Sequence, residues 1–176
     1  MNFRPLDIPG AFVLEALPHS DERGTFARAF CADELAAHGL DARVAQASIS
    51  TNRRRGTLRG MHYTALPSTE AKLVRCVRGS AHDVLLDLRP GSPALRQWVA
   101  VPLSRDGGRA VYVPPGVAHG FLTLEDETDI LYMMTAPFDP SLARTVRYDD
   151  PAFAIRWPFA PVVLSERDHT CPDFLV

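Results

Sequence analysis

Prolines and glycines divide this chain into short apolar runs, and their spacing limits what the chain can fold into. The 176 residues include fifteen prolines and eleven glycines, and few stretches between them have room for a helix. Only Asp33–His38, followed by Gly39, has the pattern of a capped helical turn or two. The sequence therefore predicts a mainly β protein with one or two short helices.

The apolar runs between these breaks predict a series of short strands. They are Phe12–Ala16, Val44–Thr51, Thr57–Tyr63, Ala71–Arg78, Ala81–Leu88, Gln97–Leu103, Ala110–Val113, Gly120–Leu124 and Thr128–Thr135. Regular spacing of short strands is typical of a sandwich or barrel. The length fits one globular domain over residues 1–176. The stretch from Asp149 onward, rich in proline and aromatic residues, is expected to form an ordered loop packed on this barrel.

One predicted strand carries acidic residues on a single face. Side chains alternate along a strand, so one face of residues 81–88 holds Asp83, Leu85 and Asp87, and the other holds His82, Val84, Leu86 and Leu88. Carboxylates on one face with aliphatic residues behind them suit a strand that lines a polar cavity. An outer strand with solvated aspartates fits the pattern equally well.

Charge and cysteine content exclude several classes of function. A formal net charge of −2 gives no general reason to bind nucleic acid or an anionic membrane, and Arg53–Arg55 is expected to be a solvated loop. Three cysteines without CxxC spacing indicate neither a disulfide framework nor a cysteine-rich zinc site. No signal peptide or long apolar segment is visible. A soluble protein of the reducing cytoplasm is expected.

Lys72 is the only lysine beside eighteen arginines, and it follows the segment Leu58–Tyr63 by about ten residues. Either a compositional bias spared it by chance, or the position needs a compact ammonium group that a planar guanidinium cannot replace. The residues around it decide between these interpretations.

The segment Pro114–His119 has the pattern P-x-G-x-x-H, which resembles the second motif of the cupin superfamily of jelly-roll proteins. A rigid Pro-Gly turn there would deliver His119 at the start of an inward strand. Metal-binding cupins also carry H-x-H in an earlier motif, whereas here His62 is followed by Tyr63 and Thr64. Two histidines on different strands are too few ligands, so no metal is expected.

The chain resembles the dTDP-4-dehydrorhamnose 3,5-epimerase family over nearly its entire length. The segments that carry the resemblance occur in family order: Asp21–Phe26, Gln46–Ser50, Gly56–Tyr63, Lys72–Val74, Gly79, Asp83–Val84, Asp87–Arg89, Pro115–Phe121, Tyr132, Asp150–Pro151, Trp157–Pro158 and Leu164–Asp168. The resemblance implies a cupin-type double-stranded β-helix (jelly-roll) barrel. It also implies an epimerase of deoxysugar biosynthesis that acts on a nucleotide-linked 4-keto-6-deoxy sugar without a cofactor.

Epimerisation beside a ketone needs a base, a group that stabilises the enolate oxygen, and an acid on the opposite face. By resemblance, His62 is the base, Asp168 orients it, Lys72 stabilises the enolate, and Tyr132 returns the proton. Taken singly, His62 fits a hydrogen-bonded core histidine, Tyr132 a buried aromatic and Asp168 a helix or turn cap. Their joint occurrence at family positions favours the catalytic interpretation.

The resemblance also assigns substrate contacts. These are Arg23, Phe26, Arg28, Gln46, Ser48, Arg59, His119, Phe138 and Arg167, with Asp83 as a supporting residue. Guanidinium groups suit pyrophosphate oxygens, and the ring of Phe138 suits stacking on the nucleotide base. Family members are usually dimers that exchange N-terminal strands, so Arg23 and Arg28 are expected to enter the partner's site.

Four residues depart from the family pattern. Arg28 and Ala143 stand where relatives carry carboxylates, Ser48 replaces an asparagine, and Glu70 replaces a glutamine. These departures leave the identity of the sugar and nucleotide open, and also whether C3, C5 or both are inverted. They support one rival hypothesis, a sugar-nucleotide-binding cupin that has lost catalysis. A metal-dependent cupin is a third, which the missing H-x-H motif disfavours.

Overall fold

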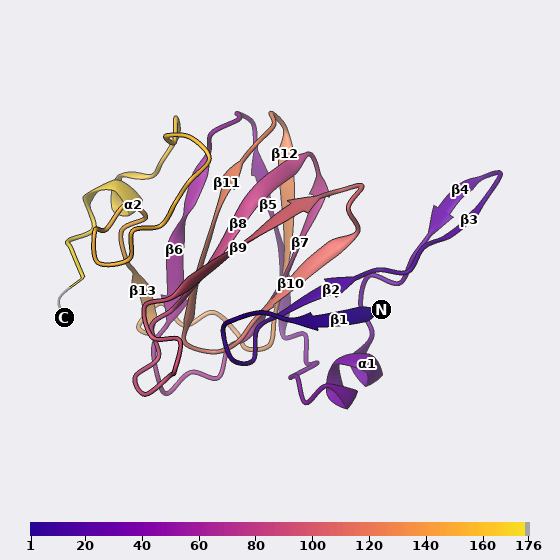
Figure 1. The fold of residues 1–176 in the computed structure, drawn as a ribbon, viewed down its shortest axis with the longest axis horizontal. Helices are drawn as coiled ribbons and strands as arrows, with labels where there is room; N and C mark the ends of the chain where they lie inside the picture. Colours follow the sequence, from indigo (N-terminus) through magenta and orange to yellow (C-terminus); the bar gives the residue numbers. More distant parts are fainter. Residues whose placement is uncertain (175–176) are drawn as a thin grey trace.

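The computed structural model, which describes residues 1–174, consists of two antiparallel sheets packed face to face (Figure 1). The larger sheet has the order β1 (Asn2–Pro5), β2 (Phe12–Glu15), β10 (Arg109–Val113), β7 (Lys72–Arg78), β12 (Thr128–Met134), β5 (Gln46–Asn52). The smaller has the order β13 (Ala143–Thr145), β6 (Leu58–Thr64), β11 (Val117–Thr123), β8 (Ser80–Asp87), β9 (Trp98–Ser104). The predicted mainly-β barrel is confirmed.

Helices are few and short. The expected helical turn is α1 (Ala32–Ala37), and a second helix, α2 (Glu166–Thr170), interrupts the C-terminal stretch that the sequence predicts as loop. No helix within residues 1–174 has the length and apolar character that a membrane crossing requires.

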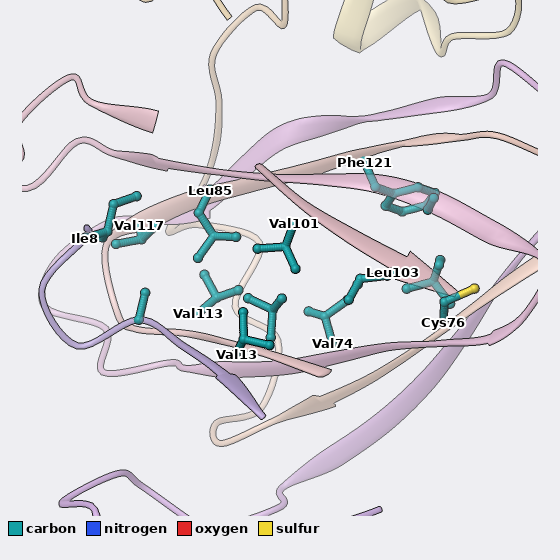
Figure 2. Packing of buried hydrophobic residues seen from close by; sticks show 14 of the residues in the cluster. Ile8, Val13, Val74, Cys76, Leu85, Val101, Leu103, Val113, Val117 and Phe121 are labelled. Carbon is teal, nitrogen blue, oxygen red and sulfur yellow. The ribbon is translucent and has the colours of Figure 1, made fainter. Parts of the chain in front are cut away.

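The main core lies between the two sheets (Figure 2). Leu85, Val101 and Phe121 come from the smaller sheet, and Val13 and Val74 come from the larger one. All five side chains are almost fully buried, and burial of each such side chain stabilises the fold by about 1.5–3 kcal/mol. This core holds the two sheets together.

The outer face of the smaller sheet is covered by the C-terminal segment. Val84 and Leu86 of β8 pack against Phe153 and Trp157, as the alternation along this strand and the expected packing of the C-terminal stretch predict. The outer face of the larger sheet is covered in the same way by Leu35 of α1 and neighbouring N-terminal residues.

The acidic face of β8 points inward and is fully buried. The solvated-aspartate interpretation is therefore wrong. Asp83 contacts His119. Asp87 instead accepts hydrogen bonds from Arg89 and Ser92, so it stabilises the turn after β8 and does not line a cavity.

A hairpin of β3 (His19–Asp21) and β4 (Gly24–Phe26) projects away from the barrel (Figure 1). Its strands pair only with each other within residues 1–174. All six strand residues are exposed, Phe26 to 80%.

Candidate active site

The polar site continues the apolar core along the same strands. Lys72 lies two residues before the core residue Val74 on β7, and Tyr132 lies two residues after the core residue Ile130 on β12. Residues two apart share a face of a strand, so both side chains point between the sheets. The interior of the barrel therefore has an apolar part and a polar part.

A close approach of two strands sets the position of His62. Gly60 of β6 and Gly120 of β11 lie backbone to backbone, and a Cβ atom at Gly60 would be 2.6 Å from Cα of Gly120. Gly60 also has φ +148°, which favours glycine. The pairing register shifts between His119 and Phe121, and His119 lies directly opposite His62. The glycine pair thus brings two histidines side by side.

His62 is paired with Asp168 of α2. The Nε2 atom of His62 lies 2.7 Å from Oδ1 of Asp168, which is only 3% exposed. Burial alone would raise the pKa of Asp168, but hydrogen bonds and charge from His62, together with donors at Gly60 and Ser165, leave this pKa below its usual value. An ionised carboxylate only accepts hydrogen bonds, so Nε2 carries the proton and Nδ1 is free to act as a base.

A second histidine–carboxylate pair lies behind the first. The Nε2 atom of His119 is 2.7 Å from Oδ2 of Asp83, and both residues are buried. The ring of Tyr132 meets the His119 ring edge to face, with centroids 5.8 Å apart. Burial and the nearby Asp83 charge raise the pKa of Tyr132 well above its usual value, although Arg59 opposes this. Tyr132 therefore keeps its phenolic proton at neutral pH.

Lys72 lies beside a buried carboxylate. Its Nζ atom is 3.5 Å from Oε1 of Glu70, and the same oxygen accepts a 2.8 Å hydrogen bond from the Thr64 hydroxyl. The Lys72 side chain is 18% exposed, so its ammonium group is held at the edge of open space and not sealed in the core.

These side chains surround connected openings. The active-site pocket, of about 260 Å³, is lined by Gln46, His62, Tyr63, Thr64, Glu70, Lys72, Tyr132, Met134, Phe138, Ala143, Arg144 and Arg167. A second cavity of about 270 Å³ shares His62, Lys72 and Tyr132 with it and adds Ser48, Ile49, Ser50, Arg59 and His119. An imidazole, an ammonium group and a protonated phenol therefore face the same space.

Six of the predicted substrate-contacting residues line these two cavities: Gln46, Ser48, Arg59, His119, Phe138 and Arg167. The amide of Gln46 accepts a hydrogen bond from the Phe138 backbone, and Asn52 accepts one from the Arg59 guanidinium. Phe138 is 63% exposed at the rim, where its ring face is open for stacking.

The structure does not bring Arg23, Phe26 and Arg28 to the pocket of their own chain. Arg23 is paired with Asp21 in the projecting hairpin, and Arg28 is paired with Glu34 of α1. Their expected role in substrate binding stays a prediction, and it requires a second copy of the chain.

Sequence reasoning did not assign Thr64 to the site, and it noted Glu70 only as a departure from the family at a substrate-contacting position, without a role. Thr64 lies two residues after His62, and Glu70 lies two residues before Lys72, so alternation along an extended chain would have placed each beside a predicted catalytic residue. Met134, Tyr63 and Arg144 were missed as well. Within residues 1–174, no three His, Cys, Asp or Glu side chains converge as a metal site would require.

Residues 5–175 match the family model for dTDP-4-dehydrorhamnose 3,5-epimerase. The chain belongs to this family. The resemblance inferred from the sequence is thereby confirmed, as is the assignment to an isomerase family.

The family's proteins match the chain nearly end to end. The dTDP-4-dehydrorhamnose 3,5-epimerase of Mycobacterium tuberculosis strain H37Rv is 40% identical, and the alignment covers 99% of this chain and 88% of that protein. A 4-keto-6-deoxy sugar epimerase from the novobiocin gene cluster of Streptomyces spheroides has a similar structure, with TM-score 0.93, 37% identity and coverage of 98% and 87%. A 3′-monoepimerase from Streptomyces bikiniensis, in complex with dTDP-quinovose, gives TM-score 0.90, 37% identity and coverage of 96% and 86%. These relatives confirm the cupin-type barrel.

Proposed function

We propose that this protein is a cofactor-independent epimerase of deoxysugar biosynthesis that acts on a dTDP-linked 4-keto-6-deoxy sugar. The observation that carries the proposal is the arrangement of His62, Lys72 and Tyr132 around one cavity. His62 reaches the cavity from the smaller sheet, and the other two reach it from the larger sheet. A sugar ring between the sheets would have the base on one face and the phenol on the other.

In the first step, Nδ1 of His62 removes the proton from a carbon next to the ketone. The electron pair of that C–H bond forms the enolate, whose oxygen carries the negative charge. The Lys72 ammonium stabilises this oxygen, and Asp168 stabilises the imidazolium that His62 becomes.

In the second step, Tyr132 donates its proton to the same carbon from the opposite face. The enolate becomes a ketone again, and the stereocentre is inverted. A phenol whose pKa is raised by burial carries its proton at neutral pH, as this step requires.

The nucleotide end of the substrate would extend toward the pocket rim. Arg59 and Arg167 offer guanidinium groups for the diphosphate, and the exposed ring of Phe138 offers a stacking surface for the base. The complex of the Streptomyces bikiniensis relative with dTDP-quinovose supports a dTDP-linked substrate.

The active assembly that we propose is a homodimer in which the β3–β4 hairpin crosses to the partner. Within residues 1–174 the hairpin strands pair only with each other and all six strand residues are exposed, and a partner barrel would cover Phe26. The three cysteines are free thiols, which is consistent with a reducing cytoplasm.

The function is tested by incubation in deuterated water with dTDP- and CDP-linked 4-keto-6-deoxy sugars, with deuterium uptake at C3 and C5 followed separately by NMR. We expect exchange with the dTDP sugar, a loss of about 10²–10⁴-fold in His62→Ala, and no change in His169→Ala, which alters an exposed histidine on α2. Tyr132→Phe should retain exchange but invert poorly. Binding without exchange at either carbon would instead indicate a non-catalytic sugar-nucleotide-binding protein.

A further inference from the structure

Glu70 is a carboxylate that the proposed reaction does not use, although it lies in the active-site pocket. Its side chain is 6% exposed. Burial of a carboxylate is unfavourable unless charge and hydrogen bonds compensate for it, so the surroundings of Glu70 need an explanation.

The backbone at Glu70 is fixed from both sides. Its N–H donates to the Ser68 hydroxyl at 3.1 Å. The next residue, Ala71, donates to the Thr135 hydroxyl at 2.8 Å and accepts from the Thr135 N–H at 3.0 Å. The side chain therefore starts from a well-defined point.

The two carboxylate oxygens of Glu70 have different surroundings. Oε1 accepts the hydrogen bond from Thr64 and lies 3.5 Å from the Lys72 ammonium. Oε2 makes no hydrogen bond within residues 1–174, and it is not among the fully buried polar atoms that lack a partner. Because Glu70 lines the pocket, Oε2 is the oxygen open to a ligand.

We infer that Glu70 is a specificity-determining residue whose Oε2 accepts a hydrogen bond from a substrate hydroxyl, next to the oxygen that Lys72 binds. The pair presents an ammonium donor and a carboxylate acceptor side by side. This combination fits a ketone with a hydroxyl on the adjacent carbon. In a 4-keto-6-deoxy sugar, that hydroxyl is on C3, because C5 bears the methyl group, the ring oxygen and a hydrogen but no hydroxyl.

The inference rests on the proposed function, and its test separates the two. Both probes are dTDP-linked 4-keto-6-deoxy sugars, one with the C3 hydroxyl and one without it. Calorimetry measures their binding to His62→Ala, which prevents turnover, and to His62→Ala combined with Glu70→Gln. Glutamine keeps the size of the side chain and an acceptor for Thr64, but it removes the charge.

With Glu70 present, we expect the C3 hydroxyl to strengthen binding about ten- to a hundredfold, as a hydrogen bond to a charged group does. In His62→Ala combined with Glu70→Gln, the two probes should bind with nearly equal affinity. The matched control, His62→Ala combined with Glu127→Gln, removes the charge of an exposed carboxylate outside the pocket, and it should keep the preference.

Two results would overturn the inference alone. One is that Glu70→Gln weakens the binding of both probes equally. The other is that it weakens the binding of neither. If neither probe bound better than dTDP itself, the proposed function would fail, and the inference with it. Lysine labelled with ¹³C gives one ε-methylene signal because the chain has one lysine; an unchanged signal in Glu70→Gln would contradict the contact itself.

Discussion

At the scale of a single residue, Lys72 is the only lysine in the sequence and also lines the pocket. Its position beside Glu70 at the pocket edge favours a required ammonium over chance survival of a compositional bias. Replacement by arginine keeps the charge but changes a compact donor into a planar fork.

We therefore expect Lys72→Arg to lose most turnover, about tenfold to a hundredfold in kcat. The control Arg53→Lys, on an exposed loop, should have no effect. Both are measured by deuterium exchange under saturating substrate. Normal turnover in Lys72→Arg would mean that the single lysine reflects composition only.

Asp168 links the site to stability through pH. Its pKa is lowered in the folded protein, so the ionised carboxylate adds stability that is fully present above its ordinary value of 3.8 and is lost as the pH falls through the lower folded value. Asp168→Asn cannot ionise. Urea unfolding measures the free energy of unfolding of the unaltered protein and of Asp168→Asn. The difference between these free energies should be largest above about pH 4 and should narrow in acid. A difference that does not change with pH would contradict the pairing.

At the scale of elements, the facing glycines of β6 and β11 are the most demanding local feature. Gly60→Ala would force a Cβ atom against the Gly120 backbone, so we expect a loss of about 1–3 kcal/mol in the free energy of unfolding and lower kcat because His62 moves. Gly91→Ala is the matched control, since Gly91 has φ +80° but no neighbouring atom within 4 Å. Chemical denaturation should show a larger loss in the free energy of unfolding for Gly60→Ala than for Gly91→Ala. Equal losses would mean that only the positive φ of each glycine matters.

Every strand predicted from the sequence overlaps an observed one, and most of these strands have one face in a core; β5 is mostly exposed. The missed strands lack that signal. β3 and β4 are exposed on both faces, β1 is mostly exposed, and β13 has only three residues. The short helix α2 could have been predicted, because Ser165–Asp168 has the S-x-x-D pattern that is typical of a helix start. In the structure the Ser165 hydroxyl accepts a hydrogen bond from the backbone N–H of Asp168.

The family resemblance singled out His62, Lys72 and Tyr132, and the structure places all three on strands around one cavity. Their catalytic roles stay a prediction. The hydrogen bond from Thr64 to Glu70 depends on how the β6–β7 connection turns, and no local pattern specifies that geometry. In the dimer that we propose, the site that Arg23 enters belongs to a second chain, and no pattern in one sequence specifies that contact.

At the scale of the whole molecule, the projecting hairpin links the proposed function to dimer formation, because the proposed site needs residues from two chains. If the hairpin crosses to the partner, His62→Ala and Arg23→Ala damage different parts of one shared site. Mixing the two inactive variants should then restore part of the activity, because each mixed dimer contains one intact site.

The measurement is turnover after the subunits are mixed and allowed to exchange, with each variant alone as control. Sedimentation should show dimers throughout. Mixed dimers without any recovered activity would mean that Arg23 serves its own chain or no site at all.

The single lysine also makes this protein unusual to handle at the bench. Reagents that couple to lysine normally spread over a protein surface, but here the one side chain that they can modify opens on the pocket. Apart from the α-amino group of Met1, which is paired with Glu34, amine-directed dyes, cross-linkers and immobilisation resins should therefore react at the pocket, and a bound nucleotide sugar should protect Lys72 against them.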